Sequence, residues 1–155
     1  MNEPTAPRGH CREAGFQIAM ATVLILDDDL GFVFWVAQAL TSAGFASIPA
    51  HSVAEAKRLL RQFKVKPDIV ILSPAISGGF EFIGELRAEN PQLGVVAAVE
   101  RAADLIIVRR EVDAVRAKPE VLSVDAMPEW RRTVRRVYSK RAKDPGKQAS
   151  AHDGN

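Results

Sequence analysis

The sequence predicts an α/β domain built on a doubly wound, five-stranded parallel sheet with helices on both faces. Continuously apolar runs, such as those at residues 22–26 and 69–72, are typical of strands that are buried on both sides. Longer segments with apolar residues at helical spacing separate these runs. Strands that alternate with helices in this way indicate a parallel sheet that is covered on both faces.

Five segments have the pattern of strands. The run at residues 22–26 is followed directly by three aspartates, and Pro67 and Asp68 introduce the run at residues 69–72. The last segment is weaker, because Arg116 interrupts its apolar residues. In chain order, the expected strands cover residues 22–26, 45–49, 69–72, 93–99 and 112–117.

Five further segments have the spacing and the boundary residues of helices. Gly44 and Pro91 are stop signals, and Pro128 stands in a first helical turn, where its missing N–H is tolerated. The segment Ser52-Val-Ala-Glu55 is a capping box, in which each polar side chain can satisfy a backbone N–H of the first turn. The expected helices cover residues 32–40, 52–63, 79–89, 102–110 and 128–141.

One domain of ordinary size accounts for most of the 155 residues. Residues 1–19 carry Pro4 and Pro7 and show no sustained periodicity, so we expect a loose N-terminal extension there. We expect the domain at residues 20–141, followed by a polar, basic C-terminal tail at residues 142–155.

Composition argues against two classes of protein. The single cysteine, Cys11, cannot form an internal disulfide, which fits a reducing compartment such as the cytoplasm. No apolar run approaches the roughly 20 residues of a membrane-spanning helix, so we expect no membrane insertion. The chain therefore resembles neither a disulfide-stabilised secreted domain nor an integral membrane protein.

The formal net charge of +2 is an average of two unlike parts. Residues 129–147 hold eight basic and two acidic side chains, which gives this segment a formal charge of +6 and leaves −4 for the rest. Such a basic cluster can attract nucleic acid, an anionic membrane or an acidic protein surface. It can equally be a solvated helix face that runs into a flexible tail.

Candidate functional residues follow several of the predicted strands. Asp27, Asp28 and Asp29 follow the first strand, and Lys118 follows the fifth. Ligands of open parallel sheets bind beyond the carboxyl ends of the strands. Clustered carboxylates repel one another unless a cation, either Mg²⁺ or the Lys118 ammonium, shares their space. Alternatively, Asp28 or Asp29 simply caps the first helix.

Three ordered motifs resemble the receiver domain of bacterial response regulators. They are Val-Leu-Ile-Leu-Asp-Asp-Asp at residues 23–29, Pro-Asp-Ile-Val-Ile-Leu at residues 67–72, and Lys118-Pro119. The resemblance covers residues 21 to about 141. It implies the flavodoxin-like receiver fold with strand order 2-1-3-4-5, a non-enzymatic role in two-component or phosphorelay signalling, and a cytoplasmic location. The implied partners are a histidine kinase, a phosphotransfer protein or an output protein.

The resemblance also assigns residues to the parts of a receiver site. Asp27 and Asp28 match the acids that bind Mg²⁺, and Lys118 matches the lysine that contacts the phosphoryl group. The phosphoacceptor aspartate of the family corresponds to Ser73 here. The hydroxyl residue that ends the fourth strand corresponds to Val99, or to Ala98 if the register shifts by one.

These two departures predict a degenerate site. A serine hydroxyl is a poor nucleophile without a nearby base, whereas a carboxylate is anionic at pH 7. Val99 cannot donate a hydrogen bond to a phosphoryl oxygen, and losing the carboxylate at Ser73 leaves Mg²⁺ binding weak or absent. We therefore expect a stand-alone pseudo-receiver that acts by protein–protein interaction without phosphorylation, with Lys118 and the acids as an electrostatic latch.

The first helix offers a candidate interface. Phe32, Trp35 and Val36 fit a buried stripe, which leaves Val33 and Phe34 turned away from the expected core. Exposed apolar side chains favour interaction with a partner, although the basic helix or the N-terminal extension can also cover them. In the family that the chain resembles, the first helix often contacts histidine kinases or phosphotransfer domains.

Three other functions compete with the pseudo-receiver. The first is an ordinary, phosphorylatable regulator whose acceptor lies at a shifted position. The second is a small phosphatase, because Asp27-x-Asp29 resembles the aspartate motif of haloacid-dehalogenase-like hydrolases. That family usually needs an added cap, for which about 120 folded residues leave little room. The third is nucleic-acid binding by the basic end, where no recognition helix or aromatic interleaving supports specific binding.

Overall fold

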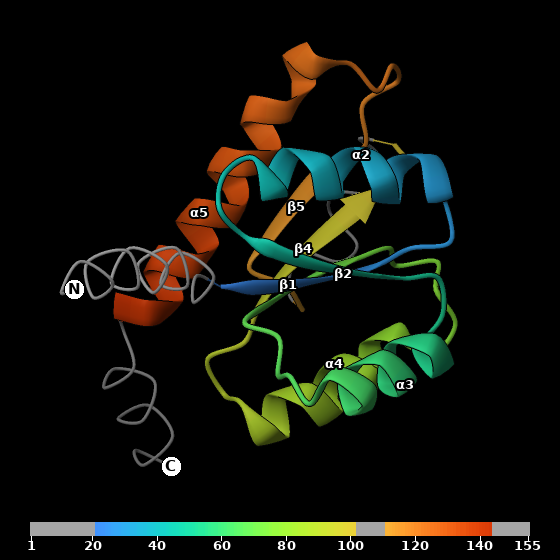
Figure 1. Ribbon diagram of the computed structural model, residues 1–155, viewed down its shortest axis with the longest axis vertical. Coiled ribbons are helices and arrows are strands. Elements are labelled where there is room, and N and C mark those ends of the chain that lie inside the picture. Colours follow the sequence, from blue (N-terminus) through green and yellow to red (C-terminus); the bar gives the residue numbers. More distant parts are fainter. Residues whose placement is uncertain (1–20, 102–110, 144–155) are drawn as a thin grey trace, which may run out of the picture.

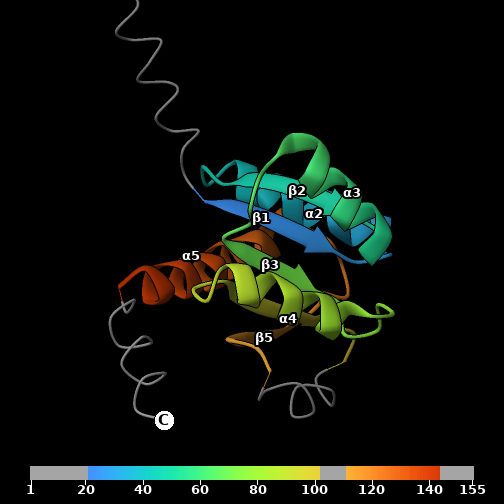
Figure 2. The ribbon, with the colours of Figure 1, turned by 90° about the horizontal axis from the view of Figure 1, so that it is seen from below.

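A computed structural model describes residues 21–101 and 111–143 of the chain. Its described strands form one parallel sheet in the order β2-β1-β3-β4-β5. The predicted fold class and strand order are therefore confirmed (Figures 1 and 2). The strands are β1 (Thr22–Leu26), β2 (Ala46–Ala50), β3 (Ile69–Leu72), β4 (Gly94–Val99) and β5 (Ala114–Ala117).

Helices cover both faces of the sheet. One face carries α2 and α5, and the opposite face carries α3 and α4 (Figures 1 and 2). Along the part of the chain that the structure describes, no helix is long and apolar enough to cross a bilayer. The predicted helix at residues 102–110 lies outside the described residues. The described helices are α2 (Leu30–Thr41), α3 (Val53–Phe63), α4 (Gly79–Glu89), α5 (Met127–Lys143) and a short 3-10 helix (Val124–Ala126).

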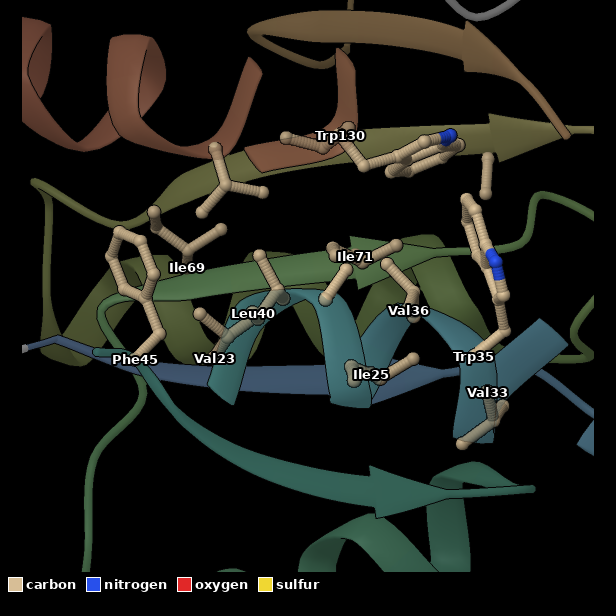
Figure 3. Packing of buried hydrophobic residues seen from close by; sticks show 14 of the residues in the cluster. Val23, Ile25, Val33, Trp35, Val36, Leu40, Phe45, Ile69, Ile71 and Trp130 are labelled. Atoms are coloured by element: carbon tan, nitrogen blue, oxygen red, sulfur yellow. The ribbon is translucent and has the colours of Figure 1, made fainter. Parts of the chain in front are cut away.

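The sheet divides the core into two layers, as the alternation of side chains along a strand requires. Val23 and Ile25 of β1 point to the α2 and α5 face, whereas Leu24 and Leu26 point to the α3 and α4 face. Figure 3 shows the first layer, in which side chains of β1, β3, α2 and α5 meet. The central strands β1, β3 and β4 are buried almost throughout, which explains their continuously apolar sequences.

Some element boundaries differ from those expected. The last strand begins at Ala114 rather than at Val112, although the N–H of Asp113 already donates to the carbonyl of Val95 at 2.8 Å. The Asp113 carboxylate accepts the N–H of Val95 at 2.8 Å and lies 3.3 Å from Arg87. At the start of α3, the Ser52 hydroxyl accepts the N–H of Glu55 as expected. The Glu55 carboxylate does not bond within the first turn as the capping box predicts. It accepts the N–H of His51, the residue before the cap.

The expected exposure of Val33 is wrong. Val33 is 1% exposed and belongs to the core, whereas Phe34 is 64% exposed. The physical reason is that α2 packs against two surfaces, the sheet and α5, so its buried arc is wider than one stripe. Val33 lies on the same flank as Val36 and Leu40, three and seven residues further on, and is buried with them.

Aromatic side chains join α2 to α5. The rings of Phe32 and Trp130 meet edge to face at 5.2 Å, and Trp35 lies 6.5 Å from Trp130. The indole N–H of Trp35 donates to the carbonyl of Ser123 at 3.0 Å. The loop between β5 and α5 is thereby held against α2, directly beside the carboxyl edge of the sheet.

Candidate functional site

The candidate site lies at the carboxyl edge of the sheet, on the side of α2 and α5. By strand alternation, Asp27 and Ser73 continue the series of side chains that faces α2. The backbone brings the strand ends together, because Ser73 N–H donates to the carbonyl of Leu26 at 3.0 Å. Likewise, the N–H of Lys118 donates to the carbonyl of Val99 at 2.8 Å.

Lys118 is the centre of the site. Its side chain is only 6% exposed, and its Nζ atom lies 2.8 Å from the Asp27 carboxylate. The same Nζ atom donates to the Glu100 carboxylate at 2.8 Å and lies 3.9 Å from that of Asp29. It also stands 4.9 Å from the centre of the Phe32 ring, at cation–π distance. The ammonium charge is therefore balanced within the protein.

Burial dominates the electrostatics of Asp27. The Asp27 side chain is inaccessible to water, and this burial raises the pKa of its carboxyl even though Lys118 and the N–H of Asp29 favour the charged form. For Lys118, burial acts to lower the pKa, but the adjacent carboxylates of Asp27 and Glu100 outweigh it and the pKa is raised. Each charge is tolerated in the interior because the other is present.

The other two acids of the triplet play different parts. Asp28 is exposed and has no ion-pair partner in the described chain. Asp29 caps α2, since its carboxylate accepts the N–H of Phe32 at 3.2 Å. The alternative that one of these acids caps the first helix therefore holds for Asp29.

Ser73 lies beneath the surface. It is 4% exposed, and its hydroxyl oxygen lies 3.4 Å from the N–H of Ala75, which donates to it. The neighbouring pocket of about 370 Å³ does not reach it. The residues that line this pocket are Asp29, Phe32, Glu100, Lys118, Pro119, Glu120 and Leu122.

The end of β4 carries no hydroxyl in either register. Val99 and Ala98 are both buried and apolar, so shifting the alignment by one residue does not change the chemistry. Val99 packs with Ala97 in a small apolar cluster, and Ala98 belongs to the core layer that includes α2.

The residues at this edge do not fit a Mg²⁺ site. Mg²⁺ requires several oxygen ligands in octahedral geometry, usually including carboxylates. One Asp27 oxygen accepts the N–H of Asp29 at 2.9 Å, and the other is paired with Lys118. Ser73 supplies a neutral hydroxyl where a further carboxylate would be needed. Among the described residues, no group of three or more acidic, histidine or cysteine side chains is arranged to hold a metal.

An apolar surface adjoins the pocket. Leu122 packs beside the first turn of α2, since a Cβ atom on Gly31 would lie 3.7 Å from its Cδ1 atom. Leu30 and Phe34 lie four residues apart on the outer face of α2, and both are more than half exposed. We call the following set the α2 surface: Leu30, Phe34, Val121, Leu122 and Val124.

Two basic features lie outside the site. Arg116 does not join the acid cluster, because its guanidinium pairs with Glu129 at 3.1 Å and donates to Thr133 at 3.2 Å. The described part of the basic segment lies in α5, whose outer face carries Arg132, Arg135, Arg136 and Lys140.

The sequence analysis assigned no role to Glu100, which directly follows the expected strand at residues 93–99. Its contact with Lys118 depends on side-chain geometry at the ends of two neighbouring strands. The available signal was the position of Glu100 directly after β4. A side chain there can face the residues that follow β5, among them Lys118.

Comparison with known proteins supports the fold. No family model matches the chain, and no curated protein matches its sequence. Structures of receiver domains do match. A CheY-like receiver domain protein from Methanospirillum hungatei superposes with a TM-score of 0.63 at 16% identity, covering 81% of this chain and 99% of that one. TrrA from Thermotoga maritima, solved with Mg²⁺ and BeF, gives 0.59 at 22% identity, with coverages of 76% and 99%.

NtrX from Brucella abortus, solved with ADP, gives a TM-score of 0.66 at 19% identity. The match covers 87% of this chain but only 30% of the NtrX chain. At these identities the likeness concerns architecture. The chain has the fold of response-regulator receiver domains.

Proposed function

We propose that the chain is a receiver-like module of a two-component or phosphorelay system that acts by binding a protein partner and is not itself phosphorylated. The observation that carries this proposal is the pairing of Lys118 with Asp27 and Glu100, together with the burial of Ser73 at the same edge of the sheet. In the family that the chain resembles, this lysine contacts the phosphoryl group.

The chemistry of Ser73 supports phosphorylation independence. A hydroxyl must lose its proton to attack phosphorus efficiently, and a base must accept that proton. His51 is the histidine of the described chain, and its ring is paired with Glu55 on the surface at the start of α3. Ser73 is also inaccessible from the pocket. These features disfavour phosphorylation at this position.

The state of Lys118 supports the same proposal. A lysine that serves a phosphoryl group must have an ammonium available for it. Here two carboxylates lie within 2.8 Å of the Nζ atom. Glu100 thereby supplies the negative charge that a phosphoryl group would bring, and we infer that the site is held in one constitutive arrangement.

The α2 surface is the proposed docking site for the partner. All twelve residues of α2 are uncharged, which is unusual for a helix with a solvent-facing side. Acidic side chains flank the apolar ones, so a partner with basic and apolar residues fits best. The exposed acids nearby are Asp28, Asp29, Glu100 and Glu120. A histidine kinase, phosphotransfer protein or output protein of this character is the expected partner.

The competing phosphatase has little structural support. A catalytic aspartate must reach its substrate, whereas Asp27 is fully buried and paired with Lys118. A shifted phosphoacceptor remains a chemical alternative, because the carboxylates of Asp28 and Asp29 are exposed.

Incubation with acetyl phosphate and Mg²⁺, followed by intact-mass spectrometry, tests the proposal. The expected result is no phosphoryl adduct under conditions that label a receiver domain with an acceptor aspartate. Any stable aspartyl adduct contradicts the proposal. Peptide mapping of that adduct to Asp28 or Asp29 would establish the shifted-acceptor alternative in its place.

A further inference from the structure

The groove between α3 and α4 lies on the sheet face opposite α2. Its volume of about 600 Å³ is within the range of ligand-binding clefts. The walls come from α3, from α4 and from the loop at residues 64–67 that leads into β3. The groove therefore extends toward the amino edge of the sheet, away from Lys118 and the α2 surface.

The lining of the groove is predominantly apolar. Leu60 and Val65 line it from the α3 side, and Phe82 and Leu86 line it from α4. Leu60, Phe82 and Leu86 also pack in the core layer beneath, so their positions are fixed by the fold. An occupant with apolar side chains would remove this lining from water.

Three cations stand at the mouth of the groove. Arg61, Lys64 and Lys66 are exposed, and in the described chain none of them takes part in an ion pair. Lys64 ends α3 in the left-handed conformation, with a φ of 55°. Its N–H bonds to the carbonyls of Arg61 and Leu60, which fixes the turn that carries these residues past the groove.

At the other end of the groove, the positive charge is already paired within the chain. Lys57 pairs with Glu85 across the two helices at 3.5 Å, and its Nζ atom lies 5.8 Å from the centre of the Phe82 ring. The unpaired positive charge is therefore concentrated beside the C-terminal end of α3.

We propose that this groove binds an acidic amphipathic helix of a partner protein. The apolar side of that helix would lie on Leu60, Val65 and Leu86, and its carboxylates would face the three cations. The helical lining runs from Lys57 to the end of α3 and from Phe82 to the end of α4, so the walls are about 11 Å long, which matches two turns of a bound helix.

The groove suits a peptide better than a nucleic acid. The apolar lining, which includes Leu60, Val65 and Leu86, offers a phosphate backbone no contacts, whereas it can pack against the apolar side of a helix. The outer face of α5, with Arg132, Arg136 and Lys140, is predominantly basic and would attract a polyanion more strongly. That face provides a matched control.

Synthetic peptides of about 15 residues, long enough to form a helix on binding, test the proposal by fluorescence anisotropy with the full chain. The first probe has a leucine stripe flanked by glutamates. The second replaces the glutamates with lysines, and the third replaces the leucines with serines. The groove variant combines Arg61→Gln, Lys64→Asn and Lys66→Gln, where asparagine tolerates the left-handed backbone. The control variant neutralises three charges on α5, with Arg132→Gln, Arg136→Gln and Lys140→Gln.

Only the first probe should bind measurably to the wild-type chain. The groove variant should bind it about tenfold more weakly or worse, whereas the α5 variant should stay within about threefold of wild type. The proposal is overturned if the first probe does not bind, if the serine probe binds equally well, or if the α5 variant loses as much affinity as the groove variant. These outcomes are separate from the acetyl phosphate result, which concerns the opposite edge of the sheet.

Discussion

The Nζ atom of Lys118 lies 2.8 Å from the Asp27 carboxylate, and both side chains are almost inaccessible to water. A buried ion pair depends on both partners, because removing one leaves an uncompensated charge in a medium of low polarity. With Glu100 as a second acidic partner, this pair explains how the Lys118 ammonium is neutralised by the chain itself.

Replacing the buried cation should destabilise the fold. Lys118→Met keeps the length of the side chain but leaves the Asp27 carboxylate buried without its partner. We expect a loss of about 3 kcal/mol in the free energy of unfolding at neutral pH, measured by urea denaturation. The double variant Asp27→Asn/Lys118→Met should recover much of that loss, since both charges are then removed. A single variant as stable as the wild type would contradict the buried pair.

The destabilisation should depend on pH with a definite sign. Burial raises the pKa of Asp27 even beside Lys118, and removing the cation can only raise it further. A carboxyl with a higher pKa in the folded than in the unfolded state favours folding as the pH falls through the folded-state pKa. The difference in the free energy of unfolding between wild type and Lys118→Met should therefore be largest above neutral pH. It should shrink as the pH falls toward about 4, the ordinary pKa of a carboxyl group.

The double variant is the control for this pH profile. The double variant has no carboxyl at position 27. The difference between its free energy of unfolding and that of the wild type should therefore not shrink in the same way as the pH falls. Unfolding curves at a series of pH values measure both differences. A gap between wild type and Lys118→Met that widens on acidification would show that Asp27 is not the titrating group.

Two neighbouring residues of α2 should respond in opposite ways to substitution. Val33→Ala should cost about 2 kcal/mol of stability, because it removes buried methyl groups from the core. Phe34→Ser should change stability by no more than about 0.5 kcal/mol, because its ring is largely exposed. Thermal and urea unfolding of the two variants measure this contrast. Equal effects would mean that the α2 surface is covered within the chain.

The bond between Trp35 and Ser123 should control the loop that borders the pocket. Trp35→Phe removes the indole N–H that donates to the Ser123 carbonyl, and we expect a loss of about 1 kcal/mol. Hydrogen exchange should become faster in the loop at residues 119–126, while the amides of β1 keep their protection. Unchanged exchange in the loop would indicate that other contacts hold it.

The fold could be predicted because its central strands carry a clear signal. Residues 22–26 and 69–72 are apolar at every position apart from Thr22, and short runs of this kind between turn residues are typical of strands buried on both faces. Val33 was misjudged because a single stripe was assumed for a helix that packs against two surfaces. The number of surfaces that a helix contacts is a property of the whole fold. It leaves little trace in the spacing of apolar residues along the helix.

The sequence indicated where the candidate site lies but not which side chains contact one another there. Positions such as Asp27, Ser73 and Lys118 follow from strand ends, which parallel topology brings to one edge. The choice of Asp27 and Glu100 as the partners of Lys118, with Asp28 left exposed, depends on side-chain geometry. The groove between α3 and α4 was missed for a similar reason, since it depends on the spacing of two helices.

The most direct test of the central claim is a nuclear magnetic resonance titration of the ¹⁵N-labelled chain with Mg²⁺ and beryllium fluoride. The receiver domain of TrrA, which has been solved with these components, serves as the positive control. If the chain itself neutralises Lys118, the amide resonances of Asp27, Ser73, Val99 and Lys118 should not shift at concentrations that saturate the control. Saturable shifts centred on these residues would show that the site still accepts a phosphoryl-like group and would contradict the account.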